Sequence, residues 1–123
     1  MQKILVVEDD KFLRSLIVRQ LKEEGFQVNE AIDGEDAIQK IIHDRPDLIL
    51  LDIILPKKSG FSVLSDIKQD PNLSLIPVII ISQLGQPEDI EKGKTMGVQE
   101  YIIKANTSLK DIINLVKKFF GKD

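Results

Sequence analysis

Four short apolar runs recur along the chain, and one further segment alternates apolar and polar residues. The apolar runs cover residues 4–7, 48–51, 78–81 and 101–103 and are rich in β-branched or bulky side chains. Such runs predict strands that are buried on both faces. The segment 27–32 alternates Val28 with Glu30, which is typical of an edge strand with one face in water.

Segments with helical spacing separate these strands. Each carries apolar residues three or four positions apart, which predicts one buried face. The predicted stripes are Phe12, Leu13, Leu16, Ile17 and Leu21; Ala37, Ile38, Ile41 and Ile42; Phe61, Leu64 and Ile67; Ile90, Met96 and Val98; and Leu109, Ile112, Ile113, Val116 and Phe120. We expect Asp10, Asp33 and either Thr107 or Ser108 to cap helices, and Gly25 and Asp70-Pro71 to end two of them.

The fourth helix, at about residues 87–96, has the weakest pattern. Gly93 and Gly97 lower its helical propensity, and few of its residues are apolar. We therefore expect it to be the most mobile helix of the molecule.

Strand and helix alternate five times, and the connections allow only right-handed crossovers. A closed barrel of this kind needs about 250 residues, whereas the chain has 123. The sequence therefore predicts one domain, residues 1–123, with an α/β flavodoxin-like (βα)5 fold. It has three layers, and its parallel five-stranded sheet has the strand order 2-1-3-4-5.

Composition narrows the possible functions. Ile, Leu and Val together make up 41 residues, cysteine is absent, and the formal net charge is -3. The charge disfavours direct nucleic-acid binding, and the missing thiols exclude disulfide and thiolate-zinc chemistry. No apolar stretch is long enough for a signal peptide or a membrane helix. We expect a soluble, cytoplasmic protein without a membrane partner.

Polar residues follow the strands at the edge where parallel sheets carry their functional groups. Glu8, Asp9 and Asp10 follow the first run, and Asp52, Ser82 and Lys104 follow the third, fourth and fifth strands. Asp52 lies between the apolar runs 48–51 and 53–55, where an ionised group is costly unless something compensates it. One lysine cannot neutralise three carboxylates, and ligands that are all oxygen atoms favour Mg²⁺ over zinc.

These residues resemble a known family. Val6-Val7-Glu8-Asp9, Leu50-Leu51-Asp52 with Pro56 and Gly60, Ile80-Ile81-Ser82 and Tyr101-Ile102-Ile103-Lys104 are similar to the receiver domain of bacterial two-component response regulators, the chemotaxis-type fold. The resemblance spans essentially the whole chain. It implies a signalling domain, not an enzyme in its own right, whose only chemistry is self-catalysed aspartyl phosphorylation and slow autodephosphorylation.

The resemblance also implies a role for each residue. Asp52 would be the phosphoacceptor for a sensor histidine kinase or a phosphotransfer protein. Asp9 and Asp52 would bind Mg²⁺ directly, Glu8 through water, and the main-chain carbonyl of Ile54 would complete the protein ligands. Ser82 and Lys104 would contact the phosphoryl group. The aromatic ring of Tyr101 would change rotamer and alter the surface of helix 4, strand 5 and helix 5 for a downstream effector. The alternative for Tyr101 is an ordinary strand aromatic with its hydroxyl in water.

The sequence departs from the family at several positions. Ala105 replaces the usual proline after Lys104, so that loop is either trans and reshaped or strained. Gln83 is bulkier than the usual residue after the strand 4 hydroxyl. Ile54 and Leu84 are apolar where many relatives have a polar group near the attacking water, so we expect slow autodephosphorylation.

Three other functions remain to be compared with this one. An aspartyl phosphatase needs a second acid two residues after its nucleophile, where this chain has Ile54. A nucleotide or flavin binder needs a phosphate-binding loop after strand 1, where Glu8, Asp9 and Asp10 would repel phosphate. A degenerate receiver, which would act as a phosphorylation-independent protein-interaction module, stays open because of Gln83 and Ala105.

Overall fold

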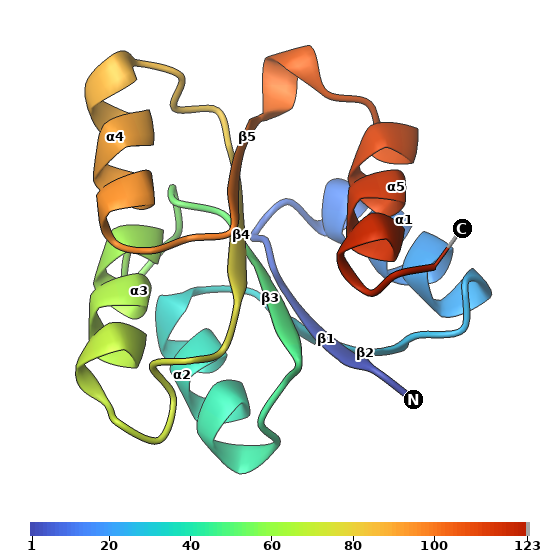
Figure 1. Ribbon diagram of the computed structural model, residues 1–123, viewed down its shortest axis with the longest axis horizontal. Helices are drawn as coiled ribbons and strands as arrows, with labels where there is room; N and C mark the ends of the chain where they lie inside the picture. The colour runs from blue at the N-terminus through green and yellow to red at the C-terminus, as the bar shows by residue number, and fades with distance from the viewer. Residues whose placement is uncertain (123) are drawn as a thin grey trace.

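The computed structural model describes residues 1–122, in which five strands alternate with five α-helices (Figure 1). The elements are β1 (Lys3–Val7), α1 (Lys11–Glu23), β2 (Gln27–Ala31), α2 (Gly34–His43), β3 (Leu48–Leu51), α3 (Gly60–Gln69), β4 (Val78–Ser82), α4 (Pro87–Thr95), β5 (Glu100–Ile103), a 3-10 turn η1 (Lys104–Asn106) and α5 (Leu109–Phe119). All neighbouring strands pair in parallel, in the order β2-β1-β3-β4-β5. The predicted fold is confirmed.

The sheet is the middle of three layers. Helices α1 and α5 cover one face, and α2, α3 and α4 cover the other (Figure 1). Successive residues of β3 point to opposite faces: Leu48 and Leu50 pack in the core under α1 and α5, whereas Ile49 and Leu51 pack in the core under α2 and α3. Because both faces are covered, the inner strands read as continuous apolar runs.

Side-chain caps begin the helices just past the strand ends. The Asp10 carboxylate accepts hydrogen bonds from the backbone N–H groups of Phe12 and Leu13, at 2.9 and 3.1 Å. Asp33 caps α2 in the same way, and Ser108 forms a reciprocal capping box with Asp111 at the start of α5. These caps confirm the predicted helix starts and keep the helix N-termini beside the carboxyl edge of the sheet.

The buried stripe of α1 differs from the prediction. Its buried residues are Arg14, Ile17, Val18 and Leu21, whereas Phe12 is 74 % exposed. The spacing is helical, but the buried side of the helix is centred on Arg14, Val18 and Leu21, and Phe12 lies on the opposite side. In α2, Ile42 is also exposed, contrary to the prediction.

Gly93 has a packing role that the sequence did not reveal. It is buried, and a Cβ built on it would lie 2.8 Å from Cδ2 of Tyr101. The absence of a side chain therefore lets α4 pack closely against the aromatic ring on β5. That α4 is the most mobile helix stays a prediction.

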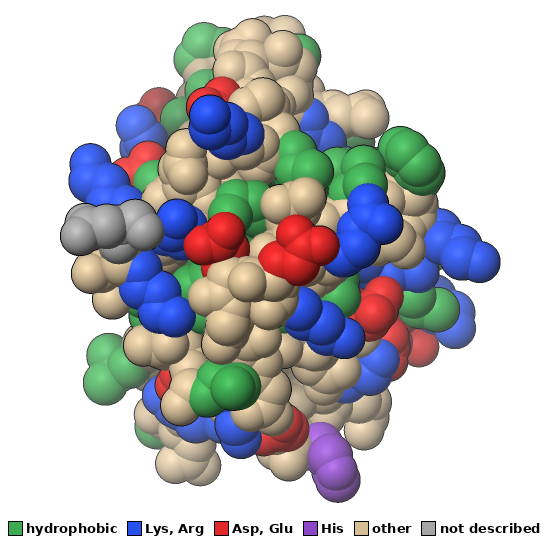
Figure 2. Space-filling model, turned by 90° about the vertical axis from the view of Figure 1, so that its right-hand side faces the viewer, with side chains coloured by type: hydrophobic (Ala, Val, Ile, Leu, Met, Phe, Trp, Pro, Cys, Tyr) green, Lys and Arg blue, Asp and Glu red, His purple; other side chains and the backbone are tan. Residues whose placement is uncertain are grey.

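The surface over α1 and α5 carries charges of both signs. Figure 2 looks onto this face and shows Lys and Arg side chains spread around acidic ones, without a continuous basic patch. One of the pairs there joins Lys117 of α5 to Glu24, just after α1, at 3.1 Å. Within residues 1–122, no helix combines the length and the apolar character that crossing a membrane requires.

Candidate functional site

A pocket of about 240 Å³ opens at the carboxyl edge of the sheet. Four strands contribute to it, through the residues that follow β1, β3, β4 and β5. Its lining consists of Glu8, Asp9, Asp10, Asp52, Ile54, Gln83 and Lys104. The parallel strands thus bring together most of the polar residues that the sequence identified, although these are up to 96 positions apart in the chain (residues 8 and 104).

Lys104 joins two of the carboxylates. Its Nζ atom lies 2.7 Å from Oε1 of Glu8 and 2.9 Å from Oδ2 of Asp52, and both carboxylates are almost completely buried. Burial alone would lower the pKa of Lys104, but the hydrogen bonds to Glu8 and Asp52 outweigh it and raise that pKa. Burial raises the pKa of Glu8, against the opposing effect of the Lys104 hydrogen bond. The ammonium group therefore stays charged near neutral pH.

Asp52 lies directly after β3 and is only 4 % exposed. Its Oδ1 atom accepts a hydrogen bond from the Ile54 N–H group at 3.3 Å, while Oδ2 faces Lys104. Gly60, the first residue of α3, packs against the same backbone: its N–H donates to the Ile53 carbonyl at 2.8 Å. A Cβ on Gly60 would lie 2.2 Å from the Asp52 carbonyl oxygen, so only glycine fits there.

Glu8, Asp9 and Asp52 form a group that can hold a metal ion. One carboxylate oxygen from each lies within 4.8 Å of the others. Glu8 and Asp52 are buried, whereas Asp9 is exposed and open to solvent. An all-oxygen donor set with one accessible side fits a hard divalent cation that keeps some of its water. The described residues therefore make a divalent metal site plausible at this position.

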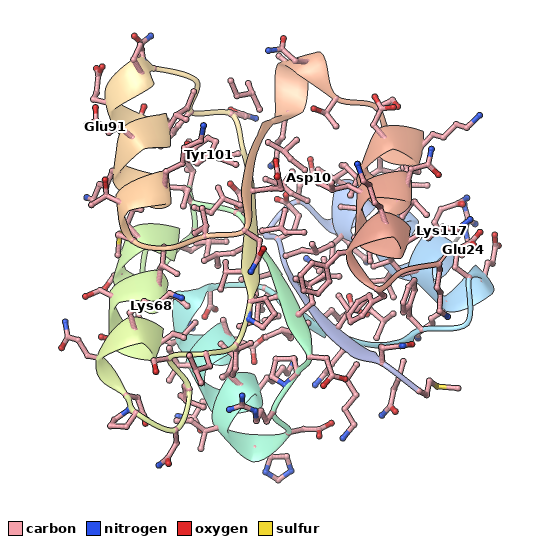
Figure 3. The ribbon with its side chains drawn as sticks, viewed as in Figure 1. Asp10, Glu24, Lys68, Glu91, Tyr101 and Lys117 are labelled. Carbon is pink, nitrogen blue, oxygen red and sulfur yellow. The ribbon has the colours of Figure 1, made fainter. Side chains whose placement is uncertain are left out.

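Ser82 and Tyr101 lie behind the pocket and meet at Leu84. Ser82 is completely buried, and its hydroxyl accepts a hydrogen bond from the Leu84 N–H at 3.2 Å. Tyr101 donates from its hydroxyl to the Leu84 carbonyl at 2.7 Å. The alternative in which this hydroxyl only meets water is therefore wrong. Figure 3 shows the Tyr101 side chain between β5 and α4. Burial, followed by the Asp89 carboxylate, raises the pKa of Tyr101.

Two departures from the family pattern have clear structural outcomes. The bond between Lys104 and Ala105 is trans, as are all peptide bonds of the described residues. Residues 104–106 form the turn η1, and Lys104 still reaches both carboxylates. Gln83 lines the pocket and is exposed.

Arg14 is the residue that sequence reasoning missed. Its guanidinium donates to the Glu8 carbonyl and to the Glu30 carboxylate, each at 2.8 Å. Position 14 falls in register with Ile17, Val18 and Leu21, and this register was the signal that could have indicated its burial. The predicted apolar stripe of this helix left Arg14 out because arginine is seldom buried.

Comparisons with known proteins agree with this geometry. Residues 4–117 match the response regulator receiver domain family. The chain is 35 % identical over 116 residues to the phosphate regulon transcriptional regulatory protein PhoB of Escherichia coli, covering 94 % of this chain and 50 % of PhoB. It is 35 % identical over 104 residues to the DNA-binding dual master transcriptional regulator RpaA of a Synechocystis strain, covering 85 % and 43 %. The chain thus spans half or less of the length of these relatives.

Solved structures give the same assignment. The Mn²⁺-bound response regulator Rcp1 superposes with a TM-score of 0.88 at 30 % identity, covering 98 % of this chain and 94 % of Rcp1. The phosphorylated cyanobacterial phytochrome response regulator RcpA superposes with a TM-score of 0.83 at 36 % identity, covering 96 % and 90 %. Fold, acidic cluster and family match agree: the chain belongs to the receiver-domain family of two-component response regulators, a signalling module rather than an enzyme.

Proposed function

We propose that Asp52 is the phosphoacceptor of this receiver domain and takes the phosphoryl group from a phosphohistidine. The observation that carries this proposal is the arrangement around Asp52, a buried carboxylate with an ammonium group at 2.9 Å and two further carboxylates within reach of one cation. Phosphoryl transfer requires positioning and positive charge around the transferred group more than covalent help from the protein. Receiver domains interact with histidine kinases, and a sensor histidine kinase or a phosphotransfer protein is the proposed donor.

The transfer exchanges one bond to phosphorus for another. A carboxylate oxygen of Asp52 forms the new O–P bond while the N–P bond of the donor breaks, and the electron pair of that bond returns to the imidazole nitrogen. Lys104 supplies positive charge beside Asp52. Ser82 would donate its hydroxyl to a phosphoryl oxygen after transfer, which requires this buried side chain to turn toward the pocket.

The proposed metal is Mg²⁺. Asp9 and Asp52 would bind it directly, Glu8 through water, and the Ile54 main-chain carbonyl would be the last protein ligand. When bound, the ion neutralises the negative charge that builds up on the phosphoryl oxygens. The carboxylate cluster supports this site, and so does the Mn²⁺-bound state of the similar regulator Rcp1.

The proposed output is a change of the surface formed by α4, β5 and α5. The Leu84 backbone bonds to both residues: its N–H donates to the Ser82 hydroxyl, and its carbonyl accepts from the Tyr101 hydroxyl. A movement of Ser82 toward a phosphoryl group would therefore disturb the hydrogen bond of Tyr101 and release the ring. A downstream effector in the cytoplasm, still unidentified, would bind the altered surface.

Intact mass spectrometry tests the phosphoacceptor. Wild type is incubated with acetyl phosphate and Mg²⁺ beside Asp52→Asn and the matched control Asp10→Asn, which changes a neighbouring acid that caps α1. We expect one phosphoryl adduct on wild type and on Asp10→Asn, and none on Asp52→Asn. An adduct that persists on Asp52→Asn would assign another acceptor. No adduct with several donors would support the phosphorylation-independent interaction module.

A further inference from the structure

Arg14 is the buried cation of the molecule. Among residues 1–122 it is the only buried Lys or Arg, with 9 % of its surface exposed. Its Nε atom donates to Oε1 of Glu30 at 2.8 Å, and its Nη1 atom donates to the Glu8 carbonyl at 2.8 Å and lies 3.5 Å from the Asp9 carbonyl. Burying a guanidinium is unfavourable unless its donors find partners, so these contacts explain why the chain can keep an arginine there.

The partners of Arg14 hold the backbone of two acidic residues of the site. Glu8 still continues the sheet, because its N–H donates to the Ala31 carbonyl of β2. Beyond this bond the chain leaves the sheet, and the Glu8 and Asp9 carbonyls turn toward Arg14. Arg14 thus ties the turn after β1 to the edge strand β2 through Glu30.

The three carboxylates differ in how firmly their side chains are held. Glu8 is fixed by Lys104 and by the Asp10 N–H group, and Asp52 by Lys104 and the Ile54 N–H group. No side-chain hydrogen bond or ion pair of the Asp9 carboxylate is found among the described residues. The position of this carboxylate therefore depends on its backbone, and the backbone depends on the turn that Arg14 holds.

We propose that Arg14 is a positioning residue for the divalent cation, acting through the backbone of Glu8 and Asp9. This inference rests on the proposed metal site. Groups that orient metal ligands from outside the coordination sphere commonly change metal affinity about 10- to 100-fold when they are replaced. Electrostatics alone predicts the opposite, because a cation near the site repels a second cation.

Arg14→Lys and Arg14→Met separate these effects. Lysine keeps the charge, but its single nitrogen cannot bridge the turn and Glu30 in the planar geometry of a guanidinium. Methionine removes the charge and keeps much of the apolar stem. Lys3→Met is the matched control, since it removes an ion pair with Asp44 at the opposite end of β1. Isothermal titration with Mg²⁺ alone measures the affinity of each folded variant.

We expect both Arg14 variants to bind Mg²⁺ at least about 10-fold more weakly than wild type and Lys3→Met to bind like wild type. Phosphorylation by acetyl phosphate should then need more Mg²⁺, with the rate at saturating Mg²⁺ close to that of wild type. Tighter binding by Arg14→Met would overturn the proposal in favour of simple repulsion. Unchanged affinity in both variants, with a lower urea midpoint, would overturn it in favour of a purely structural role.

Glu30→Ala is the second route if the Arg14 variants do not fold. It frees the Nε atom of Arg14 without removing the guanidinium, at a side chain that is 45 % exposed. Weaker Mg²⁺ binding by this variant supports the positioning role, and wild-type affinity contradicts it. A wild type that binds no Mg²⁺ would refute the proposed metal site itself, which is a different result from any of these.

Discussion

Replacing Gly93 with alanine puts a methyl group where the Tyr101 ring already lies. The new Cβ would be 2.8 Å from Cδ2 of Tyr101 and 3.1 Å from Cδ1 of Ile80. Carbon atoms that are not bonded do not approach so closely, so either α4 shifts away from the sheet or the ring leaves its place. Both responses disturb the hydrogen bond from the Tyr101 hydroxyl to the Leu84 carbonyl.

Opposing effects set the size of the change in stability. Alanine favours a helix interior over glycine by about 1 kcal/mol. Overpacking costs about 1–3 kcal/mol, and a lost hydrogen bond costs about 1 kcal/mol. We therefore expect Gly93→Ala to lower the free energy of unfolding by about 1–3 kcal/mol. The same substitution at an open helical site would raise it by about 1 kcal/mol.

Two measurements test the effect of Gly93→Ala. Urea unfolding gives the stability, with Thr95→Ala as control because it adds helical propensity at an exposed position of α4. The chain has one tyrosine and no tryptophan, so tyrosine absorbance during an alkaline titration reports Tyr101 alone. Burial and Asp89 raise its pKa above the ordinary 10.0, and displacement of the ring in Gly93→Ala should bring that pKa back toward 10.0.

The direction of the pH effect on stability follows from the same shift. The unfolded chain loses the Tyr101 proton at a lower pH than the folded protein, so wild-type stability falls as pH rises from 10.0 through the raised folded pKa. This fall should be smaller in Gly93→Ala. A variant that is more stable than wild type, like Thr95→Ala, and that keeps the raised Tyr101 pKa would refute the argument that Gly93 makes room for the ring.

Two further predictions concern the pocket and α5. Ile54→Asn should speed the loss of the phosphoryl group from phospho-Asp52, because an amide can orient the attacking water and isoleucine cannot. Mass spectrometry over time measures this decay. A half-life of seconds for wild type without a phosphatase would contradict the expected slow autodephosphorylation. Ser108→Ala should lower the free energy of unfolding by about 1 kcal/mol through loss of the capping box. The affinity for Mg²⁺ should not change. An unchanged urea midpoint would show that this cap contributes little to stability.

The sheet was predictable because its strands carry an unusually plain signal. Residues 48–51 are apolar on both faces, and both faces are covered by helices. Once four such runs and the alternating segment 27–32 are separated by helices, parallel pairing brings the carboxyl ends of the five strands to one edge. The meeting of Glu8, Asp52 and Lys104 follows from topology alone, without knowledge of any side-chain conformation.

The errors concern contacts between residues whose pairing the sequence does not reveal. Phe12 lies four residues before Leu16, but the helix turns its other side to the core, so the Phe12 side chain is exposed. Arg14 is buried because Glu30 and the turn after β1 supply acceptors. The packing role of Gly93 was missed, because nothing local in the sequence shows that the Tyr101 ring takes up the space beside it.

Because of the contact between Gly60 and Asp52, the backbone is packed more tightly on the α3 side of the pocket than on the β4 side. On the α3 side, the helix backbone at Gly60 touches the backbone of Asp52, and Val63 and Leu64 of the same helix are completely buried. On the β4 side, Gln83 is exposed and Leu84 is partly buried, and Leu84 makes one hydrogen bond through its N–H and one through its carbonyl. If Asp52 is phosphorylated as proposed, we expect the more open β4 side to move rather than the closely packed α3 side. The missing side chain at position 60 would then favour β4 as the direction of the conformational change.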